Sequence, residues 1–288
     1  MITVKLQGGL GNQLFQYAAA RALAERHGST VAFDLSSFRN TAARPDVMPR
    51  SYELDTFGIA PMQPPLLDGL ALNSGPVLFK KIGQKLRNIT IYQERSLGYD
   101  PAIGEKTTAH TYLVGYFQSE RYFENIKDTL RRDLSFQFVA DPASLPHERI
   151  LVSLHVRRGD YVSNPHAREL HGLCSLEYYR QAAAYLADRL GEITVVVFSD
   201  DQPWARAHLI LPHPVIFAEE CSTRESYRDM QFMSRCDHHI IANSSFSWWG
   251  AWLNPTSDKL VVAPHHWLAH EEDTGTSADR TPAGWIRM

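Results

Sequence analysis

Cysteine is scarce in this sequence. The 288 residues include three cysteines, Cys174, Cys221 and Cys236, an odd number with no C-x-x-C pair among them. Isolated thiols of this kind are typical of a reducing compartment, whereas secreted domains pair their cysteines in disulfides. We therefore expect reduced thiols and a cytoplasmic location.

Long apolar runs are absent as well. No stretch approaches about 18 uninterrupted apolar residues, the length that spans a bilayer. The chain opens with the short β-branched run of residues 2–6, which lacks the long apolar region of a signal peptide. The sequence predicts no membrane-spanning segment and leaves peripheral attachment at the inner face of the membrane open.

Neither sign of charge dominates. There are 29 basic and 32 acidic side chains, which give a formal net charge of −3, and the basic residues form no run. A protein that follows nucleic-acid phosphates concentrates its lysines and arginines, so we expect no nucleic-acid partner. The hydrophobic fraction of 44% belongs to an ordinary folded protein. This length suits two lobes of about 100 to 150 residues with a cleft between them.

Motifs that mark metal and cofactor enzymes are missing too. The chain has no Asp-x-Asp triplet, and His270-Glu271 is followed by Thr274 where a His-Glu-x-x-His motif needs its second histidine. We therefore expect no metal site. None of the 12 tyrosines is followed four residues later by lysine, so the Tyr-x-x-x-Lys pair of a nucleotide-sugar epimerase or reductase is absent.

What the sequence does contain is the alternating pattern of an α/β protein, clearest in its second half. Short apolar runs rich in β-branched residues lie at 151–156, 193–198, 214–217, 238–242 and 259–263. Nearly unbroken runs of this length are typical of parallel strands covered on both faces. Between the first two, Ser175 is a candidate N-cap for a helix that extends to Leu190. Strand, helix, strand is the doubly wound pattern.

The first half is less regular, with strand-like runs at residues 2–6, 30–33 and 112–117. A polar segment with two prolines at residues 141–149 is the best boundary between the halves. We therefore predict an N-terminal α/β domain over residues 1–145, a second α/β domain over 146–270 and a C-terminal strap over 271–288.

A glycine-rich turn follows the first predicted strand. Gly8-Gly9-Leu10-Gly11-Asn12-Gln13 leads into a helical pattern, so that free backbone N–H groups can face an anion such as a diphosphate. On this interpretation Gly11, Asn12 and Gln13 contact the ligand. The turn is not a dinucleotide fingerprint, because Leu14 occupies the third glycine position, and no Gly-Lys-Ser/Thr makes it a P-loop. A tight turn without a ligand is the alternative.

The strongest candidate site is His155-Val156-Arg157-Arg158-Gly159-Asp160-Tyr161. It follows the strand at 151–156, at the edge where ligands of open α/β sheets bind. Adjacent residues of a strand point to opposite faces, so one arginine can enter a cleft while the other pairs with Asp160. The alternative is a structural ion pair at the end of a strand.

Two further segments follow predicted strands. Asp200 and Asp201 can accept from ribose hydroxyls or guanine N–H groups, although one of them is expected only to cap a helix. Residues 243–253 begin with an anion-receiving helix start formed by Asn243, Ser244, Ser245 and Phe246. The tryptophans of this segment, Trp248, Trp249 and Trp252, are interpreted as core residues.

Taken together and in this order, these segments resemble the bacterial α-1,2-fucosyltransferases of glycosyltransferase family 11. The blocks that carry the resemblance are GGLGNQLFQYA, GYFQSERYF, HVRRGDY, SDD and NSSFSWWGAWLN, followed by a closing Trp-Ile-Arg. The resemblance extends from end to end. It implies a GT-B-like α/β fold with two Rossmann-like lobes facing across a cleft, the first on the acceptor side and the second holding GDP-fucose.

The resemblance also implies roles for matching residues. Arg157 would contact the diphosphate, His155 and one of Asp200 and Asp201 would approach the nucleoside, and Ser244 and Ser245 would receive phosphate oxygens beside Phe246. The carboxylate that α-1,6 enzymes place just after the arginines is not matched here. Asp160 is the first candidate for the catalytic base, and Glu169 and His171 are the alternatives.

The resemblance therefore predicts an inverting, metal-independent transfer of L-fucose from GDP-β-L-fucose to the 2-hydroxyl of a terminal galactose in an oligosaccharide. The donor is a substrate, and no cofactor is expected. Another linkage made by a GDP-fucose-dependent enzyme is one alternative, and a non-catalytic sugar-binding protein is the other.

Overall fold

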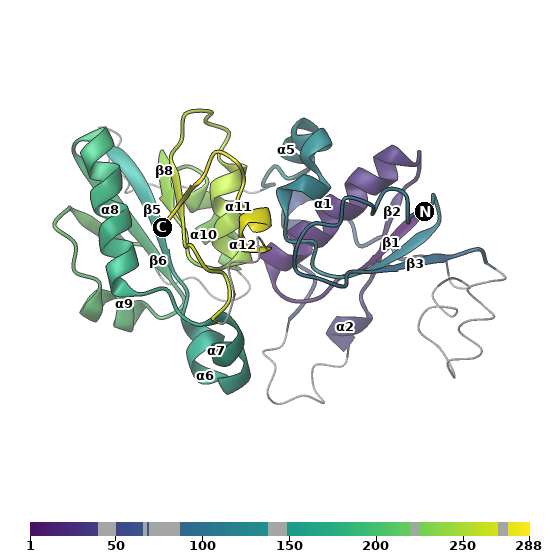
Figure 1. The fold of residues 1–288 in the computed structure, drawn as a ribbon, viewed down its shortest axis with the longest axis horizontal. Coiled ribbons are helices and arrows are strands. Elements are labelled where there is room, and N and C mark those ends of the chain that lie inside the picture. The colour runs from purple at the N-terminus through teal and green to yellow at the C-terminus, as the bar shows by residue number, and fades with distance from the viewer. Residues whose placement is uncertain (40–49, 66–67, 69–86, 138–148, 220–224, 270–275) are drawn as a thin grey trace. The chain divides into compact units, whose positions relative to one another are not determined.

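The computed structural model describes residues 1–39, 50–65, 68, 87–137, 149–219, 225–269 and 276–288 (Figure 1). The chain divides into two compact units, unit 1 from Met1 to Gln137 and unit 2 from Phe138 to Met288. The predicted boundary between residues 145 and 146 lies outside the described residues.

Unit 1 is built on a four-stranded parallel sheet in the order β2-β1-β4-β3. The strands are β1 (Ile2–Lys5), β2 (Val31–Asp34), β3 (Thr90–Gln93) and β4 (Thr111–Val114). Its helices and turns are α1 (Leu10–Arg26), α2 (Ser36–Arg39), η2 (Leu54–Phe57), η3 (Glu120–Tyr122), η4 (Glu124–Ile126) and α5 (Lys127–Asp133). The glycine turn leads from β1 directly into α1, as predicted.

Unit 2 is built on a six-stranded parallel sheet in the order β10-β9-β8-β5-β6-β7. The strands are β5 (Ile150–Val156), β6 (Ile193–Ser199), β7 (Val215–Phe217), β8 (His238–Ile240), β9 (Val261–Ala263) and β10 (Ile286–Arg287). Its helices are α6 (Gly159–Ser163), α7 (Pro165–His171), α8 (Leu176–Leu190), α9 (Gln202–His208), α10 (Ser226–Met233), α11 (Ser245–Leu253) and α12 (Thr276–Arg280).

This strand order is that of a doubly wound sheet. From β5 the chain winds through β6 and β7 on one side and then returns to β8 on the other side of β5. The winding direction therefore reverses between β5 and β8, and such a reversal is where ligands of open α/β sheets bind. The predicted fold class, α/β and GT-B-like with two Rossmann-like lobes, is confirmed by the parallel sheet of each unit.

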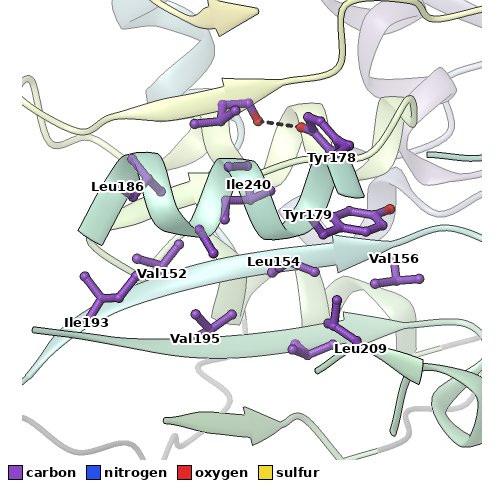
Figure 2. Close-up of a cluster of buried hydrophobic side chains, with 14 of the residues drawn as sticks. Val152, Leu154, Val156, Tyr178, Tyr179, Leu186, Ile193, Val195, Leu209 and Ile240 are labelled. Atoms are coloured by element: carbon purple, nitrogen blue, oxygen red, sulfur yellow. Dashed lines mark hydrogen bonds between the residues drawn. The ribbon is translucent and has the colours of Figure 1, made fainter. Parts of the chain in front are cut away.

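The sheet of unit 2 is covered on both faces, as its unbroken apolar strands predict. Val152, Leu154 and Val156 alternate along β5 on one face, where they pack against α8 (Figure 2). Leu151 lies on the other face and packs with Met233 of α10. Full burial of each such side chain is worth about 1.5–3 kcal/mol. The two layers therefore fix the position of β5, the strand that carries the candidate site.

Helix α8 begins where the sequence predicts. The Ser175 hydroxyl accepts a hydrogen bond from the backbone N–H of Tyr178 at 3.0 Å, which makes it the N-cap. The Tyr178 hydroxyl in turn donates to the Ile241 carbonyl at 2.7 Å and to the Val262 carbonyl at 3.2 Å. The phenol thus joins α8 to the chain at β8 and β9.

The tryptophans of α11 are core residues, which confirms the prediction. Trp248 and Trp249 are fully buried and Trp252 nearly so. The indole N–H of Trp248 donates to the Arg280 carbonyl at 2.7 Å, so the start of the C-terminal segment is fastened to this core. Its end is fastened separately, because β10 pairs with β9. Among the described helices, none has the length and apolarity needed to cross a membrane.

A polar triplet lies within the apolar core of unit 2. The Asn254 oxygen accepts from Thr256 N–H at 2.8 Å, so its nitrogen is the donor that lies 2.9 Å from His239 Nε2. His239 therefore carries its proton on Nδ1 and donates to the Ser153 hydroxyl at 2.8 Å. Burial lowers the pKa of His239 to about 3, so the ring is neutral in the folded protein.

We expect this histidine to make the protein acid-sensitive. The unfolded chain binds the proton at its ordinary pKa of about 6.5 while the folded chain does not, so stability falls as the pH drops from about 6.5 towards 3. The loss from His239 alone at pH 5 relative to pH 7 is about 2 kcal/mol. Urea unfolding at several pH values should show a shallower acid slope in His239→Gln than in wild type. The exposed His266 provides the control, because His266→Gln should leave the slope unchanged. Equal slopes in wild type and His239→Gln would contradict the assignment.

Candidate functional site

The candidate site lies at the reversal of winding in unit 2. Arg157 follows β5 directly, and the segment Asn243–Phe246 follows the neighbouring strand β8 and starts α11. Sequence positions almost 90 residues apart therefore meet at one edge of the sheet. The Tyr161 hydroxyl connects them by donating to the Asn243 carbonyl at 3.2 Å.

Arg157 is the centre of this site. Its guanidinium contacts Asp160 Oδ1 at 2.5 Å and Asp200 Oδ2 at 2.6 Å, and its side chain is 20% exposed. The Tyr161 ring lies beside the cation, 5.3 Å from ring centroid to guanidinium carbon. Two acidic partners and one aromatic face hold the guanidinium fork at the end of β5.

The pairing of the two arginines differs from the expected one. We expected the arginine outside the cleft to pair with Asp160, but it is Arg157 that does so. The reason is local: Arg158 leaves the extended conformation and α6 starts at Gly159, so a helical turn brings Asp160 back towards Arg157 three residues earlier.

Arg158 holds the other aspartate. Its Nε donates to Asp201 Oδ2 at 2.9 Å, and its guanidinium carbon lies over the Trp204 ring, 3.7 Å from the centroid. Asp201 Oδ1 accepts from Trp204 N–H at 3.2 Å and caps α9, which confirms that one of the two aspartates is an N-cap. The Arg158 backbone N–H donates to Asp200 Oδ1 at 2.8 Å. Arg158 thus holds Asp201 with its side chain and Asp200, a partner of Arg157, with its backbone N–H.

Gly159 leaves room for this arrangement. A Cβ atom at this position would lie 2.5 Å from Asp200 Oδ2, closer than real Cβ contacts occur. Since the same oxygen contacts Arg157, any larger residue at position 159 would push the carboxylate off the guanidinium. The glycine of the motif is therefore required by a close approach.

His155 presents a polar atom to this site. The side chain is 4% exposed, and its Nδ1 is buried without a hydrogen-bond partner in the described part of the chain. The ring lies 5.5 Å from that of Phe246, at the start of α11. Burial lowers the pKa of His155 to about 4, so the imidazole is neutral near pH 7. A buried nitrogen without a partner is a group that a ligand can satisfy.

The turn before α11 is held rigidly. The Asn243 amide nitrogen donates to the His171 carbonyl at 2.9 Å and to the Trp267 carbonyl at 3.3 Å, so this predicted ligand residue fastens three segments together. The Ser244 hydroxyl accepts from Phe246 N–H at 3.3 Å and caps the helix. Ser245 is the first residue of α11. The helix start is thus fixed beside the arginines, as an anion site requires.

The predicted residues of the glycine turn belong to unit 1. Gln13 is fully buried, and its amide donates to the carbonyls of Gly8 and Ser51 and accepts from Glu53 N–H. Asn12 Oδ1 accepts from Gln118 at 2.8 Å, and Gly11 lies in the first turn of α1. The Gln13 side chain is fully used in shaping the loop, which the sequence pattern did not reveal.

The structure also brings in residues that sequence reasoning missed. Trp204 stacks with Arg158, and Tyr161 stacks face to face with His171 at 4.5 Å between centroids. A tryptophan three residues after a strand-end aspartate pair gives no sequence signal that an arginine stacks on it. Within the described residues, no group of three or more His, Cys, Asp or Glu side chains is arranged to hold a metal ion.

Comparison with known proteins gives consistent matches. The family described as Glycosyl transferase family 11 matches residues 85–288. An alpha-1,2-colitosyltransferase of Escherichia coli is 32% identical over 100% of this chain and 99% of its own length. The O-antigen biosynthesis glycosyltransferase WbnK of Escherichia coli is 31% identical over 98% of this chain and 99% of its own. Among solved structures, the fucosyltransferase NodZ from Bradyrhizobium has a TM-score of 0.46 and 16% identity, covering 88% of this chain and 93% of that one.

The stack between Arg158 and Trp204 can be tested directly. Arg158→Lys keeps the positive charge but loses the planar cation and the Nε donor, so we expect the free energy of unfolding to fall by about 1–2 kcal/mol. Urea denaturation measures it. Arg180→Lys, on the exposed face of α8, is the matched control and should change stability by less than about 0.5 kcal/mol. Equal free energies of unfolding for the two variants would show that the stack does not stabilise the fold.

Proposed function

Because the chain belongs to glycosyl transferase family 11, we propose that it transfers L-fucose from GDP-β-L-fucose to the 2-hydroxyl of a terminal galactose in an oligosaccharide. The two full-length relatives support a glycosyl transfer, and the first is named for the same α-1,2 linkage. The donor and the linkage rest on the motif resemblance to the α-1,2-fucosyltransferases.

One observation carries the proposal: Arg157 and the start of α11 lie together at the winding reversal of unit 2. The guanidinium already binds two oxygens, one from each aspartate, at 2.5 and 2.6 Å. Two oxygens of a diphosphate fit the same fork. The nine-residue helix α11 adds a positive dipole end. This is the arrangement that a nucleoside diphosphate leaving group needs.

The nucleoside part has partners in the same site. The unpartnered His155 Nδ1 can hydrogen-bond to the ligand, and the Phe246 ring offers an apolar face beside it. Asp200 and Asp201 are both engaged by the arginines, but a carboxylate has about four lone-pair positions and can accept further bonds. These residues keep the binding roles that the resemblance implies.

The chemistry is a single in-line displacement. The acceptor 2-oxygen forms a bond to C1 of fucose while the bond from C1 to the diphosphate oxygen breaks, and the electron pair leaves with GDP. Inversion turns the β-linked donor into an α-linked product. Arg157 and the start of α11 stabilise the charge on the diphosphate. Preorganised donors of this kind are worth about 2.7–4 kcal/mol each, so no metal ion is required.

The acceptor proton goes to a base, for which Asp160 is the first choice. A diphosphate that takes over the Arg157 fork frees the Asp160 carboxylate, which can then accept the proton of the acceptor hydroxyl. His171 is the alternative, since burial lowers its pKa and leaves the ring neutral and able to accept a proton. Glu169, exposed on α7, is the second alternative.

Transfer itself provides the first test. Purified protein with GDP-fucose and a panel of galactose-terminated oligosaccharides should release GDP and give an α-1,2-linked product, with the linkage read by NMR. Treatment with EDTA should leave the rate unchanged, because Arg157 and α11 replace a cation. GDP-colitose is the competing donor to include, since one relative is named as a colitosyltransferase. GDP binding without release from any GDP-sugar would make the protein a non-catalytic binder.

The role of Asp160 provides the second test. Asp160→Asn keeps the shape and removes the basicity, so we expect kcat to fall by about 10² or more while the Kd for GDP changes little. Asp188→Asn, an exposed aspartate on α8, is the matched control. A variant that retains kcat, or that loses GDP binding instead, would make Asp160 a structural partner of Arg157. The base would then be His171 or Glu169.

A further inference from the structure

Unit 1 has a winding reversal of its own. Its strand order places β1 next to β4, with β2 on the far side of β1 and β3 on the far side of β4. From β1 the chain goes to β2 on one side and then reaches β3 and β4 on the other. The carboxyl ends of β1 and β4 therefore flank the position where open α/β sheets bind ligands.

A cavity lies at this edge of the sheet. Its volume is about 280 Å³, and it is lined by residues that follow three strands, namely Gln7 after β1, Val114–Tyr116 at β4 and Gln93–Leu97 at β3. Pockets for drug-sized ligands are about 300–1,000 Å³, so this one suits a sugar ring rather than a whole nucleotide sugar.

The lining has the chemistry of a carbohydrate site. Tyr116 is 38% exposed and offers an aromatic face, next to the exposed side chain of Leu97. The amides of Gln7 and Gln93 supply both donors and acceptors, and Ser96 adds a hydroxyl. Aromatic faces pack on the C–H face of a sugar ring while amides bind its hydroxyls.

The charge of the cavity favours a neutral ligand. Glu94 contributes a carboxylate to the cavity lining. This group accepts the backbone N–H of Tyr116 at 2.7 Å and of Phe117 at 3.1 Å. It is balanced by one cation, Arg95, in the same lining. A nearly balanced pair offers no excess positive charge for a diphosphate.

The loop at this cavity is built like the one at Arg157. In unit 2, Asp200 at the end of β6 accepts the N–H of Arg158 in the loop after the neighbouring β5, and Gly159 makes room for it. In unit 1, Glu94 at the end of β3 accepts the N–H groups of Tyr116 and Phe117 in the loop after the neighbouring β4. A Cβ on Gly115 would lie 2.5 Å from Glu94 Cβ. Both loops are thus held in place before a ligand arrives.

We propose that this cavity binds the terminal galactose of the acceptor, with Tyr116 stacked on its ring and Gln7 and Gln93 on its hydroxyls. The proposal rests on the proposed function, because it assigns the second substrate of that reaction. Tyr116 and Gln93 then determine which acceptor is used, and the donor site in unit 2 is independent of them.

The test compares binding with turnover. Tyr116→Ala and Gln93→Ala should each raise the KM for a galactose-terminated acceptor by about tenfold or more, while the Kd for GDP and the hydrolysis of GDP-fucose in the absence of acceptor stay as in wild type. Saturation-transfer NMR with methyl β-D-galactoside should show binding to wild type and its loss in both variants. Met62→Ala, an exposed apolar side chain of the same unit outside the cavity lining, is the control.

The outcomes separate the two proposals. Unchanged acceptor KM and unchanged galactoside binding in both variants would overturn the cavity assignment and leave the transfer reaction standing. The second outcome is that the variants lose galactoside binding but the wild-type protein never releases GDP from a GDP-sugar. This result would support the cavity assignment and overturn the proposed function. Gln93→Ala removes only a surface side chain of β3, so the test holds even if Tyr116→Ala loses its fold.

Discussion

The pairing of Arg157 with Asp160 and Asp200 is the interaction on which the site depends. A guanidinium that is only 20% exposed is costly to bury without partners, and here its partners come from α6 and from the end of β6. The ion pairs therefore join the end of β5, the start of α6 and the end of β6 at one point. Asp200 reaches the cation because Arg158 N–H holds its other oxygen and Gly159 leaves the space. Asp200 is thus held by backbone on one side while it pairs with the guanidinium on the other.

Because Arg157 already pairs with two carboxylates, the proposed donor would have to replace at least one of them at the guanidinium. An incoming oxyanion has to form hydrogen bonds with the guanidinium that are at least as strong as those of the two carboxylates. A diphosphate can do so because of its higher charge and matching geometry. The exchange links the two halves of the proposed reaction, since donor binding at Arg157 releases the carboxylate proposed as base. A neutral sugar cannot drive the same exchange.

Much of this structure follows from sequence patterns that tertiary contacts reinforce. The strands of unit 2 were predictable because Val152, Leu154 and Val195 belong to runs buried on both faces, and Ser175 was predictable as a cap. The strands β3 and β10 were not predicted, since β3 alternates between buried and exposed positions at a sheet edge and β10 has two residues. Pattern reasoning also paired Asp160 with the wrong arginine, because the turn at Gly159 depends on backbone angles that residue types do not specify. Gln13 looked like a ligand residue, yet its amide serves three backbone groups.

Both units solve the same physical problem at the carboxyl edge of a parallel sheet. Loops leave that edge with free backbone N–H groups, and a mobile loop loses conformational entropy when a ligand orders it. A carboxylate at the end of the adjacent strand removes this cost by accepting those N–H groups beforehand, as Asp200 does for Arg158 and Glu94 does for Tyr116. The two carboxylates differ in which of their oxygens remain for other partners. Asp200 keeps one oxygen for a cation and so shapes an anion site, whereas Glu94 spends both oxygens on backbone and leaves Tyr116 and its neighbouring amides to face a neutral ligand. The charged donor and the uncharged acceptor of the proposed reaction need that difference.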